Sequence, residues 1–268
     1  MIKVSVICLA YNHEAYIRKA LDGFVMQQTD FQFEVLVHDD ASSDGTAAII
    51  REYAARWPDI IRPVLQTENQ HAKGLRTGLD ILGPMIQGEY VALCEGDDYW
   101  TDPHKLSRQV AALEAHPEID ICAHRTKKVK NGRPHGYEGP GRRTRIIPAE
   151  EVIMGGGGLV ATCSIMCRRD AYLNDTPMRK ALFLDYTLQV QASLRGGMLY
   201  LGDCMSVYRR GVPNSWTTSR RSIRKIDYYP AFIRMLEILD EWTEGRYSSV
   251  IRIRKARYTF HIIIGKLL

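Results

Sequence analysis

The chain has 268 residues, of which 45% are hydrophobic and 25% are charged. This composition can bury a full core, so it excludes a disordered chain and fits one large domain or one domain with an appendage. The formal net charge of +5 is uneven, because residues 209–268 carry 13 Lys and Arg against 5 Asp and Glu, which leaves a balance of −3 for residues 1–208.

The first segment, residues 3–10, is rich in β-branched residues, with an apolar run of seven residues from Val4. Polar residues follow it, and no small-residue cleavage pattern is present. It therefore predicts a first strand and not a signal peptide. No stretch approaches the ~20 apolar residues needed to cross a bilayer, so we expect the chain not to span a membrane. The six cysteines form no Cys-x-x-Cys pair, which favours a reducing cytoplasm and argues against structural zinc.

Predicted strands and helices alternate through the first part of the chain. Runs rich in β-branched residues at 33–37, 61–66 and 90–94 predict strands, and residues 14–28 and 46–57 place apolar side chains on one helical face. This alternation predicts an α/β fold with a doubly wound, mostly parallel sheet flanked by helices. Polar clusters follow three of the strands, so we expect them to meet in one crevice at the carboxyl ends of the strands.

The second part of the chain has weaker patterns. We predict a helix over 103–115, a strand over 119–123, a polar loop or hairpin over 127–145, and an apolar strand over 159–167 after a glycine run. Helical spacing resumes at Ser222 and continues to the end as a basic helical C-terminal extension, residues 216–268.

Asp97 and Asp98 come shortly after the strand at 90–94. Adjacent carboxylates repel, so ionising both is favourable mainly when a hard cation lies between them, and Mg²⁺ or Mn²⁺ takes one or two carboxylates plus substrate phosphates. The pair therefore indicates a metal site, with a solvated turn leading into the next helix as the alternative.

A second acidic pair, Asp39 and Asp40, follows the strand at 33–37. Asp40 is placed to accept a hydrogen bond from the ring N–H of uracil or thymine, and Tyr11 offers a stacking face for the base. Lys73 and Arg76 lie in a loop before the strand at 90–94 and could meet a diphosphate, although surface lysines and arginines are commonly only solvated.

Three segments together resemble the family 2 glycosyltransferases of the GT-A fold. The stretch VSVICLAYN (4–12) resembles the opening strand of that family, DDASSDGT (39–46) its Asp-Asp-Gly-Ser-Thr-Asp-Gly-Thr signature, and EGDDYW (95–100) its Asp-x-Asp-type metal motif. The matches occur in the expected order over residues 3–116. A looser match covers LDYTL (184–188), Gly196-Gly197 and Tyr208-Arg209.

The resemblance implies a role for each matched residue. Ala10, Tyr11 and Asp40 would hold the nucleoside base, Asp97 would contact the ribose or the metal, Asp98 would bind the metal, and Asp185 would be the catalytic base. It also implies a GT-A catalytic domain over 1–215, with a nucleotide-sugar-binding half at 1–116 and an acceptor and catalytic half at 117–215.

The chain departs from the family pattern after Tyr208. Many relatives carry a histidine there that reaches the metal or the diphosphate, whereas here Arg209-Arg210-Gly211 follows and no histidine occurs between His135 and His261. We expect an arginine to neutralise the leaving diphosphate instead.

The C-terminal extension combines an apolar face with basic side chains, among them Arg252, Arg254, Lys255 and Arg257. Such a pattern suits an anionic membrane surface, and the alternative is a helix packed on the catalytic domain with its charges solvated. We expect a cytoplasmic protein that binds peripherally at the inner face of the cell membrane.

These patterns and the resemblance predict an inverting, Mn²⁺- or Mg²⁺-dependent glycosyltransferase. It would transfer a sugar from a UDP- or dTDP-sugar to a hydroxyl of a glycan or lipid-linked acceptor in cell-envelope or capsular polysaccharide synthesis, with no nucleic acid as partner. A sugar-1-phosphate nucleotidyltransferase would need a glycine-rich basic loop after the first strand, and residues 11–14 contain no glycine. A non-catalytic sugar-nucleotide-binding or scaffold protein of the same fold stays as the alternative.

Overall fold

The computed structural model describes residues 1–213, 215, 218 and 224–267. The predicted start of the C-terminal helix at Ser222 lies outside these residues. Within them, ten strands form one sheet in the order β3-β2-β1-β4-β9-β6-β10-β5, with β7 paired to β6 and β8 to β10. The strands are β1 Ile2–Ala10, β2 Gln32–Asp39, β3 Ile61–Leu65, β4 Tyr90–Leu93, β5 Tyr99–Trp100, β6 Ile121–Lys130, β7 Arg133–Glu138, β8 Arg145–Ile147, β9 Met166–Arg168 and β10 Met198–Arg210.

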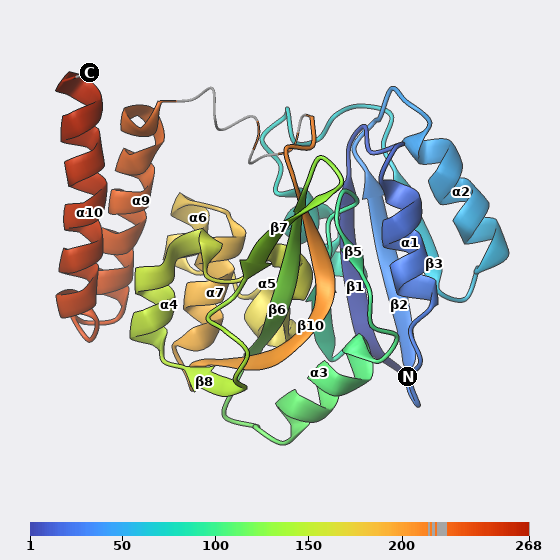
Figure 1. The fold of residues 1–268 in the computed structure, drawn as a ribbon, viewed down its shortest axis with the longest axis horizontal. Coiled ribbons are helices and arrows are strands. Elements are labelled where there is room, and N and C mark those ends of the chain that lie inside the picture. The colour runs from blue at the N-terminus through green and yellow to red at the C-terminus, as the bar shows by residue number, and fades with distance from the viewer. Residues whose placement is uncertain (214, 216–217, 219–223, 268) are drawn as a thin grey trace.

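Helices cover the sheet on both sides, with α9 and α10 as a long pair at one end of the molecule (Figure 1). The helices are α1 Ile17–Val25, α2 Thr46–Arg56, α3 Lys105–Glu114, α4 Ala149–Gly155, α5 Arg169–Leu173, α6 Pro177–Ala181, α7 Asp185–Ser193, α9 Lys225–Trp242 and α10 Ser248–Leu267. The helices and strands in the first part of the chain follow the predicted alternation.

The central strand β1 explains the layered arrangement. It pairs in parallel with β2 on one side and β4 on the other. Its side chains alternate between two cores: Val6 and Cys8 lie in the core that contains α1 and α3, and Ile7 lies in the core that contains α4 and α7. A strand buried on both faces reads as a continuous apolar run, which is the pattern of residues 4–10.

The segment at 127–145 is a hairpin in part. Strand β6 runs on to Lys130, and Asn131 and Gly132 turn the chain with φ of 49° and 74° before β7. Two central residues with positive φ form the type I′ turn whose twist matches the flanking strands, and Asn-Gly favours it. The predicted strand at 119–123 is therefore too short. The polar second half of β6 continues the strand because it pairs with β7 and β10.

The predicted strand at 159–167 is mostly wrong. Only Met166–Arg168 forms a strand, and Thr162–Ser164 forms a helical turn in which Ser164 Oγ donates to the Ala161 carbonyl at 2.6 Å. Val160 and Cys163 are fully buried nonetheless. A short apolar run reports burial and cannot by itself distinguish a strand from a buried turn.

The two C-terminal helices pack on the rest of the molecule. Met235 and Leu239 of α9 are fully buried, and Tyr258 of α10 is 6% exposed in the same core. Arg254 donates to the Met154 carbonyl at 2.9 Å and thereby ties α10 to α4. The inner face of α9 and α10 therefore packs on the rest of the protein, as the second of the two sequence interpretations predicts. No helix among the described residues is long and apolar enough to cross a membrane.

Candidate functional site

The three polar clusters meet at one edge of the sheet, as the strand order requires. Ala10 at the end of β1 lies in register with Asp39 at the end of β2. The backbone N–H of Asp40 donates to the Ala10 carbonyl at 3.0 Å, and that of Gly96 donates to the Leu9 carbonyl at 2.9 Å. The segments after β1, β2 and β4 are thus joined by backbone hydrogen bonds.

An acidic cluster forms where β4 ends. One carboxylate oxygen from each of Glu95, Asp97 and Asp98 lies within 4.8 Å of the others. Asp97 is 6% exposed and Asp98 is 1% exposed. Burial raises the pKa of Glu95 to about 8, with a further contribution from the neighbouring Asp97, and burial also raises the pKa of Asp98 well above its ordinary value.

The chemistry of this cluster fits a hard divalent cation. Three closely spaced carboxylates, two of them buried and one partly buried, favour their ionised state only with a compensating charge. Oxygen donors are the ligands that Mg²⁺ and Mn²⁺ select. Asp97 and Asp98 were predicted as site residues from the sequence, whereas Glu95 appeared only as part of the motif. The motif could have identified Glu95 as well, because Glu95 occupies its first acidic position.

Arg209 supplies positive charge beside the cluster. Its backbone N–H donates to Asp98 Oδ1 at 2.7 Å, and its guanidinium donates to the Asp97 carbonyl. The guanidinium carbon lies 4.4 Å from the centre of the Tyr99 ring and 5.4 Å from that of Tyr16. Stacking between two rings orients the planar group. The Tyr-Arg segment therefore does bring an arginine to the acidic residues.

His13 lies beside the acidic cluster and was not predicted from the sequence. It is 8% exposed, its backbone N–H donates to Thr46 Oγ1 at 2.8 Å, and its Nδ1 has no hydrogen-bond partner within the described chain. A Cβ built on Gly96 would lie 2.9 Å from that nitrogen. Glycine at 96 therefore lets the imidazole lie against the backbone between Glu95 and Asp97. Burial lowers the pKa of His13, and the Asp97 carboxylate opposes this change.

Asp185 begins α7 close to the acidic cluster. Its carboxylate accepts hydrogen bonds from Thr162 Oγ1 at 2.8 Å and from the backbone N–H of Tyr186 at 2.7 Å. It contributes, after burial and Asp97, to the raised pKa of Glu95. Two segments that are 90 residues apart in sequence are thus within electrostatic reach of each other, and the looser half of the resemblance points to the same crevice.

Asp40 and Tyr11 lie at the same edge of the sheet. Tyr11 is 41% exposed, so its ring is accessible for stacking on a nucleoside base. The Asp40 carboxylate accepts the backbone N–H groups of Gln70 and His71 at 2.7 and 3.1 Å. A carboxylate has about four acceptor positions, so Asp40 can still accept a base N–H while it holds this loop.

Lys73 and Arg76 pair with acidic residues. Lys73 forms an exposed ion pair with Glu68. Arg76 lies between Asp80 and Asp175, each at 2.6 Å, and partly buried against Phe183. Contact with a diphosphate would require these pairs to open, so their assignment to the donor stays a prediction.

Comparison with known proteins identifies the fold. TarS of S. aureus, residues 1–349 in complex with UDP-GlcNAc, has a TM-score of 0.65 at 20% identity and aligns with 89% of this chain and 67% of its own. The mannosyltransferase PcManGT of Pyrobaculum calidifontis, in complex with GDP-Man and Mn²⁺, has a TM-score of 0.60 at 17% identity over 99% of this chain and 73% of its own. The predicted fold class, a mostly parallel sheet flanked by helices as in GT-A glycosyltransferases, is confirmed.

Sequence comparison extends over most of the chain. The uncharacterized protein Rv1520 of Mycobacterium tuberculosis is 38% identical over 222 residues, which cover 83% of this chain and 63% of that protein. The chain therefore spans less than two thirds of the length of this curated relative. The family described as Glycosyl transferase family 2 matches residues 5–173, which include the edge of the sheet with Tyr11, Asp40 and the acidic cluster. The chain belongs to glycosyl transferase family 2.

Proposed function

We propose that this protein transfers a sugar from a nucleoside-diphosphate sugar, a UDP- or dTDP-sugar, to a hydroxyl of a glycan or lipid-linked acceptor with inversion at the anomeric carbon. The observation that carries the proposal is the acidic cluster with Asp185 within electrostatic reach of Glu95. One set of carboxylates can serve the leaving group and a separate carboxylate can serve the attacking hydroxyl. Membership of glycosyl transferase family 2 supports the same reaction.

The donor would lie along the carboxyl ends of β1, β2 and β4. In this pose Tyr11 stacks on the base, Asp40 and the backbone at Ala10 hold its polar edge, and Asp97 lies at the ribose. The solved complexes of TarS and PcManGT contain UDP-GlcNAc and GDP-Man, respectively, which supports a nucleotide-sugar donor here.

A Mn²⁺ or Mg²⁺ ion would be held by Asp98 with help from Asp97 and Glu95, and it would supply Lewis-acid stabilisation of the leaving diphosphate. The Arg209 guanidinium, stacked on Tyr99, lies beside these carboxylates and adds positive charge. PcManGT holds Mn²⁺ in its complex, which supports this choice of ion.

Asp185 would accept the proton of the acceptor hydroxyl. As the proton leaves, the hydroxyl oxygen bonds to the anomeric carbon from the face opposite the diphosphate, and the bond from that carbon to the diphosphate oxygen breaks. Configuration inverts because one displacement occurs and no sugar becomes attached to the enzyme. Thr162, which donates to Asp185 Oδ2, would fix the orientation of the base.

We also propose the division of the chain that the sequence suggested: a donor half at 1–116, an acceptor and catalytic half at 117–215, and a C-terminal extension at 216–268. Asp185 at the start of α7 and the acidic cluster after β4 then come from different halves, which supports an acceptor entering between them. TarS is named as a poly(ribitol-phosphate) β-N-acetylglucosaminyltransferase, which supports a cell-envelope polymer as acceptor.

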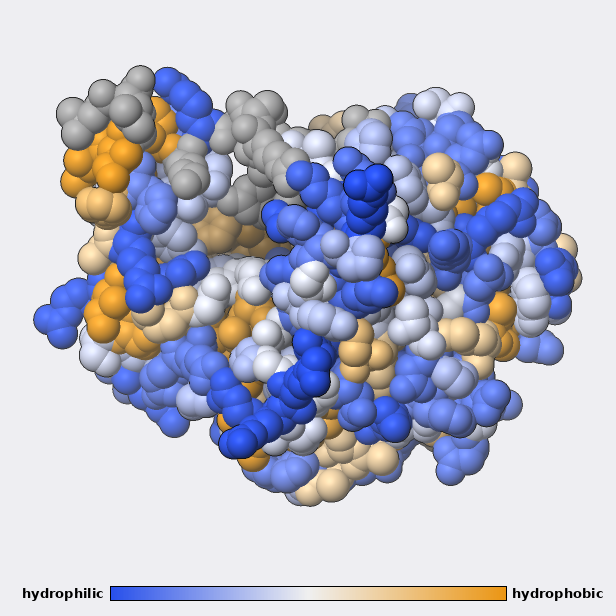
Figure 2. Space-filling model, viewed as in Figure 1, coloured by the Kyte–Doolittle hydropathy of each residue, from blue (hydrophilic) through white to orange (hydrophobic). Residues whose placement is uncertain are grey.

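The outer face of α10 supports a peripheral position on an anionic membrane at the cytoplasmic side. Ile253, Phe260 and Ile263 are 53%, 60% and 53% exposed, and hydrophobic atoms are visible where α10 lies (Figure 2). Residues 248–267 contain five Lys and Arg and no Asp or Glu. An apolar face with basic flanks inserts shallowly among anionic headgroups.

Charge reversal tests the membrane position best at Arg252 and Arg257, because both are exposed, whereas Arg254 and Lys255 bind neighbouring residues. The double change to Glu should weaken sedimentation with vesicles that contain an anionic lipid, and added salt should weaken binding of the parent. Arg51→Glu on α2 is a matched exposed control. Equal binding by all three proteins would contradict the membrane position.

The reaction itself is tested by screening UDP-, dTDP- and GDP-sugars for metal-dependent thermal stabilisation and then for turnover. A donor at 100 times its Kd adds roughly 2.7 kcal/mol to the stability of the folded state. The non-catalytic alternative predicts stabilisation without donor hydrolysis or transfer, with or without Mn²⁺. Transfer with retained configuration would contradict the inverting mechanism.

A further inference from the structure

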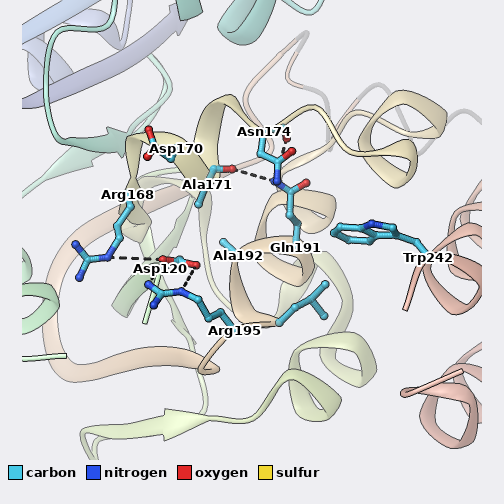
Figure 3. A pocket seen from close by; sticks show the side chains of 10 residues that line it. Asp120, Arg168, Asp170, Ala171, Asn174, Gln191, Ala192, Arg195 and Trp242 are labelled. Atoms are coloured by element: carbon cyan, nitrogen blue, oxygen red, sulfur yellow. Dashed lines mark hydrogen bonds and ion pairs between the residues drawn. The ribbon is translucent and has the colours of Figure 1, made fainter. Parts of the chain in front are cut away.

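A groove lies at the end of α7 opposite Asp185. It has a volume of about 560 Å³, within the range of ligand sites in proteins, roughly 300–1,000 Å³. We call it the α7–α9 groove, because α7 forms its floor and the end of α9 forms one wall (Figure 3). Its lining includes Asp120, Asn174, Gln191, Ala192, Arg195 and Trp242.

One wall of the groove is aromatic. Trp242, the last residue of α9, is 40% exposed, and its indole faces α7 across the groove (Figure 3). The floor opposite it contains the buried residues Gln191 and Ala192. An exposed indole provides a flat apolar surface at little conformational cost, and it gains most from a ligand with a flat apolar face.

The other wall is polar and has balanced charge. Arg195 and Arg168 both pair with Asp120, at 2.5 and 3.6 Å, while Asp170 is 95% exposed at the rim. Two positive and two negative side chains therefore line the groove. A phosphate or a nucleotide would meet no net positive charge, and a cation would meet a carboxylate that is already paired. The balance favours a neutral ligand.

Hydrogen-bonding groups are also available. Gln191 is held by its own contacts, since its amide donates to the carbonyls of Ala171 and Asn174 at 3.0 and 2.9 Å. The side-chain amide of Asn174, by contrast, bonds to none of the residues that the structure describes, and it lies exposed at the groove. Planar amides and guanidinium groups match pairs of adjacent hydroxyls, which makes one wall suited to the polar edge of a sugar ring.

We propose that the α7–α9 groove binds a neutral oligosaccharide, with one pyranose ring stacked on Trp242 and its hydroxyls bonded by Asn174 and Arg195. This inference rests on the proposed function in one respect, because it assigns the bound glycan to the acceptor. The groove lies at the far end of α7 from Asp185, and nine helical residues at 1.5 Å each separate the two ends by about 13 Å. The groove is therefore an anchoring site and not a second reaction site.

Anchoring has a specific kinetic consequence. An acceptor long enough to reach both Asp185 and the groove gains a second contact at high effective concentration, whereas a disaccharide reaches only one of them. Trp242→Ala should then raise KM for long acceptors about tenfold, which corresponds to about 1.4 kcal/mol, and leave kcat and the KM for short acceptors unchanged.

Direct binding tests the groove without any transfer reaction. Cello- and chito-oligosaccharides from disaccharide to hexasaccharide would be titrated calorimetrically into the parent, Trp242→Ala and Asn174→Ala. We expect the parent to bind the longer members and both variants to bind them about tenfold more weakly. Trp57→Ala is the matched control, a partly exposed tryptophan at the end of α2, and it should bind as the parent does.

The outcomes separate the two proposals. Oligosaccharide binding that depends on Trp242, in a protein without transferase activity, would support the groove and contradict the proposed function. No binding by either series, or equal binding by parent and Trp242→Ala, would overturn the groove assignment whatever the activity. A dimer that is lost in Trp242→Ala, by sedimentation velocity, would identify the groove as a contact between copies and overturn it as well.

Discussion

Lys105 offers a quantitative test of the packing behind the acidic cluster. The side chain is fully buried, its Nζ lies 3.9 Å from the centre of the Trp100 ring, and it donates to Gln109 Oε1 at 2.7 Å. None of the described carboxylates forms an ion pair with it. Burial lowers the pKa of Lys105 from 10.5 to about 8. We therefore expect Lys105→Met to stabilise the protein near neutral pH.

The magnitude follows from the pKa. At about 1.4 kcal/mol for each pKa unit, burying the charged form costs about 3 kcal/mol. The variant leaves the Gln109 carbonyl without its donor, which costs about 1 kcal/mol. Methionine fills nearly the same volume and keeps contact with Trp100, so the net gain in the free energy of unfolding is about 2 kcal/mol near pH 7.

The direction in which this stability difference changes with pH also follows from the pKa of Lys105. The folded pKa lies below the unfolded pKa, so the cost is complete below about pH 8 and disappears as the pH rises above 10.5. The difference in stability between Lys105→Met and the parent should shrink across that window, and comparing the two proteins cancels the titration of other groups. Urea unfolding at several pH values measures it. Lys180→Met, at an exposed lysine, should change stability by less than about 0.5 kcal/mol.

A Lys105→Met protein that is less stable than the parent near pH 7, or a difference that does not vary with pH, would refute this reasoning. Either result would mean that the ammonium has a favourable partner in the folded protein. The stacking on Trp100 would then outweigh the loss of hydration.

Three further predictions concern the site. Asp98→Asn should abolish Mn²⁺-dependent donor binding in calorimetry, because the neutral amide loses the charge that compensates for dehydration of the cation. Unchanged donor affinity would contradict the assignment of Asp98 as a metal ligand. Gly96→Ala should destabilise the fold by about 1–3 kcal/mol, since its Cβ would lie 2.8 Å from Ile17 Cδ1 and 2.9 Å from His13 Nδ1, and an unchanged melting temperature would contradict the close packing. Arg209→Lys should weaken donor binding while the protein stays folded, because lysine cannot keep both the stacked plane and the forked donors, and parental affinity would argue against a diphosphate clamp.

The part of the site built by parallel strands could be predicted from the sequence. Each of β1, β2 and β4 is recognisable as a short apolar run. Because ligands bind at the carboxyl ends of such strands, Tyr11, Asp40 and Asp97 are expected to lie together. Local pattern and topology are sufficient here because the side chains follow the strands directly.

The remainder depends on contacts between distant segments. His13 gave no signal for its position, since its burial results from the close approach of Gly96, more than 80 positions away. The run at 159–167 is equally apolar as a strand or as a buried turn, so its pattern could not decide. The α7–α9 groove combines Trp242 with α5 and α7, and no periodicity in the sequence relates them.

For a similar reason, the sequence could not decide whether the C-terminal helices pack on the domain or bind a membrane. An amphipathic basic helix is consistent with packing and with membrane binding, because both need an apolar face. The structure shows Tyr258 buried and Phe260 60% exposed, so α10 has apolar side chains on two faces. Charge and hydropathy alone do not reveal which apolar residues a neighbouring helix covers.

Asp185→Asn gives the most direct test of the central claim, that this chain transfers sugar with Asp185 as the base. The change keeps the size of the side chain, its oxygen can still accept from the Tyr186 N–H, and its new amide NH2 can donate to the Thr162 hydroxyl, so α7 should begin as before. We expect near-parental donor and metal affinity by calorimetry and a loss of about 10²–10⁴-fold in the rate of transfer. A folded Asp185→Asn protein that binds donor and transfers sugar at close to the parental rate would show that Asp185 only supports the start of the helix, and the claim would be contradicted.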